Sequence, residues 1–173
     1  MMPKPAILLI GGLDYCYDDW KSLSTKFSLQ EYIIGGRKMF LARCRAGEYD
    51  GVVGLYRSNS STSVTGPFDA ELISALPKSL KYICHNGAGY DNIDVSAATD
   101  AGLQISSTPQ AVDNATADVA IFLMLGALRK ATIPLKAVRE GKWRGATPVG
   151  HDPQGKTLGI LGMGGIGRVW IDS

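Results

Sequence analysis

The sequence has few of the groups that build metal sites or disulfide frameworks. It contains three cysteines and two histidines among 173 residues. Cys16, Cys44 and Cys84 are odd in number, lie far apart and form no C-x-x-C pair, so we interpret them as small, partly buried thiols of a reducing compartment. We therefore expect neither a structural disulfide nor a bound metal.

The chain also lacks a dominant charge and a long apolar run. Its 18 basic and 16 acidic residues give a net charge of +2, and they form no basic run, which disfavours nucleic acid as a partner. The longest apolar run, residues 119–128, is half of the roughly 20 residues that a membrane span needs. The apolar segment Ala6–Ile10 is too short for a secretory signal, and Gly11 and Gly12 end it. We expect a cytoplasmic protein with no membrane association.

What the sequence does contain is a regular alternation of apolar segments with segments of helical periodicity. Hydrophobic residues make up 45% of the chain and charged residues 20%, which is ordinary for a globular protein with a core. Short continuous apolar segments are typical of strands that are covered on both faces. Strands are expected at Ala6–Ile10, 31–34, 51–56 and 80–84, and one more is expected at Gln104–Ser106. The alternation predicts a parallel α/β sheet of four or five strands.

Helices are expected between these strands and after them. One begins near Asp18, Asp19 or Ser22 and continues through Lys26, and the others cover residues 38–46, 70–76 with Asp69 as N-cap, 114–131 and 134–140. Apolar residues dominate 114–131, so we expect this helix to be buried on most sides. The polar residues 58–66 are predicted to be a loop, residues 145–154 a loop or linker, and residues 107–113 a domain boundary.

A glycine-rich turn follows a further apolar segment near the end of the chain. Residues 157–161 are predicted to form a strand that runs into Gly162, Gly164 and Gly167, spaced as G-x-G-x-x-G. The first glycine permits a sharp turn, the second lets a pyrophosphate approach the main chain, and the third lets the next helix pack closely. The helix N-terminus then presents free amides to the phosphates. The alternative is an ordinary strand-to-helix turn.

A second loop, residues 86–94 with the sequence NGAGYDNID, follows the strand predicted at 80–84. Its small residues leave several backbone amides unobstructed, and such a row of amides suits a carboxylate or phosphate oxygen. It also lies beyond the carboxyl end of a strand, where open α/β sheets usually bind ligands. The alternative is a tight turn in which Asp91 and Asn92 cap the next helix.

Four motifs, in order, together resemble the D-isomer-specific 2-hydroxyacid dehydrogenases, and most closely their fungal glyoxylate or hydroxypyruvate reductase-like members. The motifs are NGAGYDNID, SSTPQAVDNATADVAIFLMLGALR, REGKWRG and GKTLGILGMGGIGR. The resemblance implies an oxidoreductase that transfers hydride between NAD or NADP and a small 2-oxo or 2-hydroxy acid such as glyoxylate or hydroxypyruvate. It also implies a flavodoxin-like substrate-binding lobe at residues 1–107, the beginning of a Rossmann domain at 108–173, an active site between the lobes, and a homodimer in the intact family.

The resemblance also assigns roles to particular residues. The amides of Ala88 and Gly89 would hold the substrate carboxylate, and Arg57 would face the substrate cleft. Thr116 would touch the cofactor, while the remaining cofactor contacts fall on the glycine-rich turn. These are Gly162, Gly164, Gly165, Ile166 and Gly167.

The chain departs from the family pattern in its last part. The arginine, glutamate and histidine that carry the family's chemistry would lie beyond residue 173, as would the residue that reads the cofactor ribose. His85 and His151 are interpreted as structural or solvated. Trp170 is bulky for the helix that should follow the glycines, and a splice or frame change near Arg168 would explain this unusual residue. We therefore expect no catalytic residue and no turnover from this chain. The alternatives are a truncated product that acts only by binding or association, and an unrelated nucleotide-binding module.

Overall fold

The computed structural model describes residues 3–143 and 147–172, which form two compact units. The first unit is Met1–Thr108 and the second is Pro109–Ser173. Of the loop predicted at 145–154, residues 145 and 146 lie outside the described residues. No helix among the described residues is long and apolar enough to cross a membrane.

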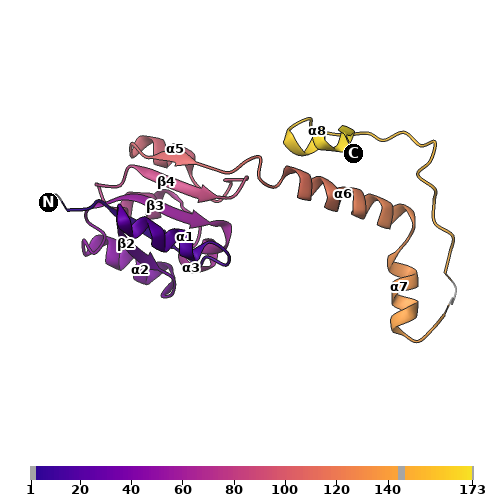
Figure 1. Cartoon of the computed structure of the whole chain (residues 1–173), viewed down its shortest axis with the longest axis horizontal. Coiled ribbons are helices and arrows are strands. Elements are labelled where there is room, and N and C mark those ends of the chain that lie inside the picture. Colours follow the sequence, from indigo (N-terminus) through magenta and orange to yellow (C-terminus); the bar gives the residue numbers. More distant parts are fainter. Residues whose placement is uncertain (1–2, 144–146, 173) are drawn as a thin grey trace. The chain divides into compact units, whose positions relative to one another are not determined.

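Five parallel strands form the centre of the first unit (Figure 1). They are β1 (Ala6–Ile10), β2 (Ser28–Tyr32), β3 (Val52–Ser58), β4 (Tyr82–Asn86) and β5 (Gln104–Ser106). Their order in the sheet is β2-β1-β3-β4-β5, which is the flavodoxin-like order. The predicted α/β class, with a parallel sheet of four or five strands, is confirmed.

The second strand is displaced from its predicted position at 31–34. It begins three residues earlier, where the Ser28 amide donates to the Pro5 carbonyl (2.9 Å), and ends at the buried Tyr32 beside Ile10. Ile33 and Ile34 lie outside it and are exposed. The prediction was wrong because it followed these two apolar residues, whereas pairing with β1 decides where the strand lies.

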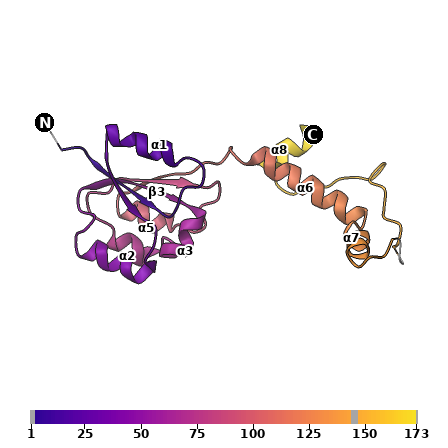
Figure 2. The ribbon, with the colours of Figure 1, turned by 60° about the horizontal axis from the view of Figure 1, so that its bottom comes forward.

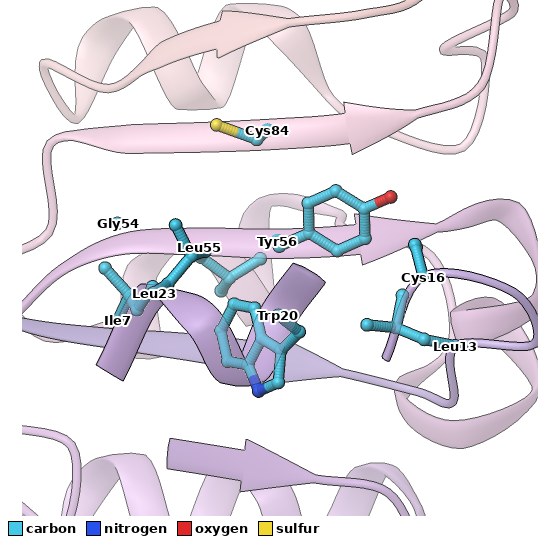
Figure 3. Close-up of a pocket in the computed structure, with 9 residues that line it drawn as sticks. All are labelled: Ile7, Leu13, Cys16, Trp20, Leu23, Gly54, Leu55, Tyr56 and Cys84. Atoms are coloured by element: carbon cyan, nitrogen blue, oxygen red, sulfur yellow. The ribbon is translucent and has the colours of Figure 1, made fainter. Parts of the chain in front are cut away.

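The two faces of the sheet are covered differently. Leu8, Leu55 and Ile83 point to the face that packs against α2 (Gly36–Arg45), α4 (Ala70–Ala75) and α5 (Val95–Asp100), and there they form the main core. Figure 2 shows α1 (Tyr17–Ser22) on the opposite side of the sheet from α2, α3 (Thr62–Thr65) and α5. Beside α1 and the following turn η1 (Leu23–Thr25), that opposite side has an apolar cavity of about 210 Å³ (Figure 3). It is lined by Ile7, Leu13, Cys16, Trp20, Leu23, Gly54, Leu55, Tyr56 and Cys84.

The serine-rich segment 58–66 is mostly helical, so the prediction of a polar loop was wrong. It contains η2 (Asn59–Ser61) and α3 (Thr62–Thr65). The Ser61 hydroxyl donates to the Ser58 carbonyl (2.6 Å), and both Ser61 and Thr65 are fully buried. A hydroxyl group that donates to a nearby carbonyl has its hydrogen bond satisfied within the protein and does not require water. These polar residues can therefore pack inside the unit.

Aspartates cap two helices of the first unit. Asp69 accepts from the Leu72 amide (3.0 Å) at the start of α4, which confirms its predicted role. Asp94 accepts from the Ala97 amide (2.9 Å) at the start of α5, so the alternative in which Asp91 and Asn92 cap that helix is wrong.

The described residues of the second unit form the helices α6 (Asp113–Leu128), α7 (Thr132–Arg139) and α8 (Gly165–Asp172). Residues 157–161 form no strand, contrary to the prediction. A strand requires a hydrogen-bonded neighbour, and none of the described residues 109–143 and 147–172 forms one.

Helix α6 is far more exposed than its apolar sequence predicts. Phe122 is 72% exposed and Leu123 62%, and the buried residue of the helix is Ala117. Within the second unit α8 lies beside α6, where Gly165 meets Asp113 (Figure 1). The prediction of a buried helix was wrong because the described part of this unit supplies too little surface to cover it.

Candidate functional site

The loop of residues 87–91, called here the 87–91 loop, begins at the carboxyl end of β4. Arg57 and His85 are register neighbours on β3 and β4, as are Ser58 and Asn86. Parallel strands bring their carboxyl ends to one edge of the sheet, so the 87–91 loop lies beside the turn that follows β3. This edge collects most of the polar residues of the unit that are buried.

The first residue of the loop is tied to the end of the unit. The Gly87 amide donates to Oγ1 of Thr108 (3.0 Å), and the Thr108 amide donates to the Gly87 carbonyl (3.0 Å). This reciprocal pair uses the Gly87 amide within the chain. Of the small residues predicted to offer amides, Ala88 and Gly89 are therefore the ones to consider.

The middle of the loop is held by His85. This side chain is 2% exposed, and its Nε2 lies 2.9 Å from the Gly89 carbonyl oxygen. A carbonyl only accepts, so Nε2 carries the proton and donates. Burial lowers the pKa of His85, and the nearby Arg57 charge adds to this, so the ring is neutral near pH 7. Its buried Nδ1 has no hydrogen-bond partner among the described residues. His85 is therefore not solvated, and its contact with Gly89 fits the structural interpretation.

The amides of Ala88 and Gly89 donate no hydrogen bond to any of the described residues. Ala88 is half-buried and Gly89 is exposed, so a ligand can reach both. In contrast, the Gly89 carbonyl is held by His85, and the neighbouring Gly87 amide is held by Thr108. The Tyr90 and Asp91 amides likewise donate no hydrogen bond to any of the described residues. A fixed backbone with unused amide donors is suited to an anionic oxygen pair.

Arg57 is fully buried at the end of β3. Its guanidinium donates to side chains and carbonyls of the chain itself and lies 4.6 Å from the centre of the Phe68 ring. Burial lowers its pKa to about 10, which still leaves it charged at neutral pH. A place in an open substrate cleft was predicted for this side chain, and that role stays a prediction.

The glycine-rich turn lies in the second unit and leads into α8. Gly162 has φ +95°, a conformation that favours glycine, and a Cβ on Gly167 would collide with the Gly162 carbonyl. Gly164 faces open space. The Arg168 amide donates to the Gly164 carbonyl (3.1 Å), so the amides of Gly165 and Ile166 precede the first helical hydrogen bond. These features fit a pyrophosphate at the helix N-terminus, although the Asp113 carboxylate also lies against Gly165.

Two further residues considered in the sequence, Thr116 and His151, are exposed in the second unit. Thr116 lies exposed on the second turn of α6, and its amide donates to the Val112 carbonyl (2.9 Å). His151 is exposed, with its amide bonded to the Leu128 carbonyl (2.7 Å). Within residues 3–143 and 147–172, no three histidine, cysteine or acidic side chains gather as metal ligands.

Sequence reasoning missed two residues that shape the loop. Thr108 was interpreted as part of the domain boundary at 107–113, and Asn92 as a helix cap. Thr108 reaches a partner 21 residues away, and Asn92 one that is 35 residues away. Periodicity and local motifs carry no signal for such distant pairs.

Comparison with known proteins identifies relatives of the whole chain. The family profile described as D-isomer specific 2-hydroxyacid dehydrogenase, catalytic domain, matches residues 46–162. The chain is 61% identical over 164 residues to 4-methyl-2-oxopentanoate reductase A of Aspergillus oryzae, covering 95% of this chain and 50% of that protein.

Two solved structures extend the comparison. A glyoxylate reductase from Paecilomyes thermophila is 64% identical, with a TM-score of 0.95 over 99% of this chain and 52% of that one. An NADPH-dependent glyoxylate/hydroxypyruvate reductase from Sinorhizobium meliloti, solved with NADP and malonate, is 27% identical, with a TM-score of 0.72 over 98% of this chain and 49% of that one. The chain thus spans about half the length of the relatives it matches.

Proposed function

The chain belongs to the D-isomer-specific 2-hydroxyacid dehydrogenase family, and from this premise we propose that its 87–91 loop binds the carboxylate of a small 2-oxo or 2-hydroxy acid. In this proposal residues 1–107 are the substrate-binding lobe and residues 108–173 begin an NAD(P)-binding domain. The family consists of oxidoreductases, and relatives of this chain are named for reduction of glyoxylate, hydroxypyruvate or 4-methyl-2-oxopentanoate. Glyoxylate and hydroxypyruvate are the substrates that we favour.

One observation carries the proposal. The amides of Ala88 and Gly89 have no acceptor among the described residues, while His85 and Thr108 fix the backbone on either side of them. Two donors on an anchored backbone need no reordering when an anion arrives, and such preorganisation favours binding. A carboxylate has two oxygens that accept hydrogen bonds, so one carboxylate can take both of these donors.

A nicotinamide cofactor fits the second unit in part. Amides of Gly165 and Ile166 would contact the pyrophosphate, with Gly162, Gly164 and Gly167 allowing its approach, and Thr116 would contribute a hydroxyl. When bound, the nicotinamide would supply or accept the hydride. We propose NAD or NADP, and the Sinorhizobium meliloti relative was solved with NADP.

The direct test compares glycolate with glycolamide, in which a neutral amide replaces the carboxylate of glycolate. Ligand-observed NMR with the 173-residue chain should show glycolate binding on the order of millimolar, about −4 kcal/mol, and weaker binding of glycolamide. Ala88→Pro removes one amide donor and should weaken glycolate binding several-fold, whereas Ala88→Val keeps the donor and serves as the control. Equal binding of both ligands would contradict the proposal.

We further propose that the 173-residue chain does not catalyse hydride transfer. His85 is committed to the Gly89 carbonyl, and His151 lies in the second unit with no acidic partner to orient it among the described residues. General acid–base catalysis alone is typically worth about 10²–10⁴-fold. NADH and NADPH oxidation with glyoxylate should stay at background, and turnover that survives removal of contaminating enzymes would refute this.

The exposed apolar side of α6 favours association as a second function. Val119, Phe122 and Leu123 are each more than half exposed, and such a cluster favours contact with another protein surface. We propose that intact family members use it for homodimerisation. Light scattering should show self-association of the chain, and Phe122→Glu should reduce it. A monodisperse monomer at high concentration would argue against this.

A further inference from the structure

Arg57 is a buried cation that no carboxylate compensates among the described residues. Its Nε donates to Oγ of Ser61 (3.1 Å), and its Nη2 donates to the Ser58 carbonyl (3.1 Å) and to Oγ1 of Thr62 (2.9 Å). Its Nη1 approaches Asn92 at Oδ1 (3.2 Å) and at the carbonyl oxygen (3.5 Å). A guanidinium has five N–H donors, so these five acceptors use all of them.

A saturated guanidinium has no donor left for a substrate. Direct binding of a carboxylate would require one of these internal bonds to break inside a fully buried site, and the acceptor left behind would be unpaired. The geometry therefore favours an indirect role for Arg57, through the residues that it holds.

The residue that connects Arg57 to the 87–91 loop is Asn92, which follows the loop directly. Its Nδ2 donates to Oδ1 of Asn59 (2.9 Å), and its carbonyl accepts from the Phe68 amide (2.9 Å). The Phe68 ring in turn lies under the guanidinium. Arg57 thus clamps one end of the loop, while His85 and Thr108 hold the rest.

A buried charge without an opposite partner costs stability, because the protein interior solvates it less well than water does. Such a charge also favours any anion that binds nearby, since the low local dielectric weakens screening. We propose that Arg57 is a positioning residue that holds the end of the 87–91 loop through Asn92, and that its uncompensated charge makes this loop prefer anionic over neutral ligands. This inference rests on the proposed carboxylate-binding function.

Three substitutions in the full chain separate position from charge. Arg57→Gln removes the charge and most of the bonds, Arg57→Lys keeps the charge but not the planar fork, and Asn92→Asp keeps an acceptor while giving Arg57 an opposite charge. Far-UV circular dichroism and dispersed amide spectra confirm that each variant folds. The measurements are the ratio of glycolate to glycolamide affinity and the ¹⁵N heteronuclear NOE of residues 88–91 without ligand.

The two readouts should move differently. Arg57→Gln should lower the affinity ratio roughly tenfold, the order expected for one buried charge acting on a nearby anion, and should lower the loop NOE values. Arg57→Lys should lower the NOE values while it keeps most of the ratio. Asn92→Asp should lower the ratio. Because it keeps the Arg57 contact and loses the Nδ2 donor to Asn59, its NOE values should fall less than those of Arg57→Gln.

The outcomes distinguish this inference from the proposed function. A wild-type chain that prefers glycolate, with an unchanged ratio in Arg57→Gln and Asn92→Asp, would overturn the charge effect alone. Unchanged NOE values in Arg57→Gln and Arg57→Lys would overturn the positioning role, whether or not glycolate binds. A wild-type chain without any preference for glycolate would overturn the proposed function and the charge effect together. If Arg57→Gln does not fold, Arg57→Lys and Asn92→Asp decide the matter.

Discussion

Gly87 occupies a position at which one added methyl group should disturb the whole loop. A Cβ there would lie 2.6 Å from Nε2 of His85 and 2.9 Å from Nδ2 of Asn59, closer than real Cβ atoms approach such atoms. Its φ is not positive, so Gly87→Ala tests this contact and not backbone strain. His85 is buried and bonded to Gly89, so moving its ring breaks the bond that holds the loop.

The size of the effect follows from two opposing contributions. Overpacking in a well-packed site costs about 1–3 kcal/mol, and the reduced entropy of the unfolded chain on Gly→Ala substitution returns about 0.4–1 kcal/mol. A net loss of about 1–2 kcal/mol is therefore expected, equivalent to a decrease in Tm of roughly 5–15 °C for a unit of this size.

Two further glycines provide controls for this experiment. Nothing lies within 4 Å of a Cβ on Gly12, so Gly12→Ala should be neutral or slightly stabilising. A Cβ on Gly89 would lie 3.2 Å from Oδ1 of Asp91, a contact that a small shift relieves, so Gly89→Ala should fall between the other two. Urea and thermal denaturation followed by circular dichroism give the order. The reasoning is refuted if Gly87→Ala is as stable as Gly12→Ala.

Three other predictions concern ionisable groups. Burial lowers the pKa of His85 below 6.5, so the unfolded chain takes up this proton first as pH falls, and stability is lost below about pH 6.5. His85→Gln should flatten the decrease in denaturation midpoint between pH 7 and 5, and an unchanged decrease would contradict this. The Leu72 amide and then Arg37 lower the pKa of Asp69 below 3.8, so the contribution of its charge to stability is present above that pH and is lost as pH falls. The stability difference between wild type and Asp69→Asn should therefore shrink from pH 5 to 3, and a constant difference would contradict this. Burial raises the pKa of Cys44 to about 11, so a disulfide reagent followed by mass spectrometry should label exposed Cys84 first, and faster labelling of Cys44 would exclude the described packing.

The sequence predicted those parts of the fold that depend on local pattern. Ala6–Ile10 is a strand with the predicted bounds because it is a short apolar segment between Pro5 and Gly11. The bounds of Gln104–Ser106 were also predicted, although Ile105 is the one apolar residue among its three. The cap at Asp69 was predicted because a capping side chain bonds only a few residues away.

The errors share a physical cause, which is that the deciding partner lies far along the chain or is lacking among the described residues. Residues 157–161 have the composition of a strand but no neighbour to pair with, and α6 has the composition of a buried helix but little to cover it. Arg57 lies at a strand end, where arginine is usually solvated. It is buried here because its guanidinium donates to acceptors on Ser61, Thr62 and Asn92. Pairings of this kind leave no periodic signal in the sequence.

The central claim is that the Ala88 and Gly89 amides receive a carboxylate. A ¹⁵N-resolved titration of the 173-residue chain with glycolate measures this directly, because each amide reports its own hydrogen bond. The account predicts saturable shifts that are largest at Ala88 and Gly89, small at the already bonded Gly87, and clearly smaller with glycolamide at equal concentration. Shifts scattered over the surface, or equal shifts with both ligands, would contradict it.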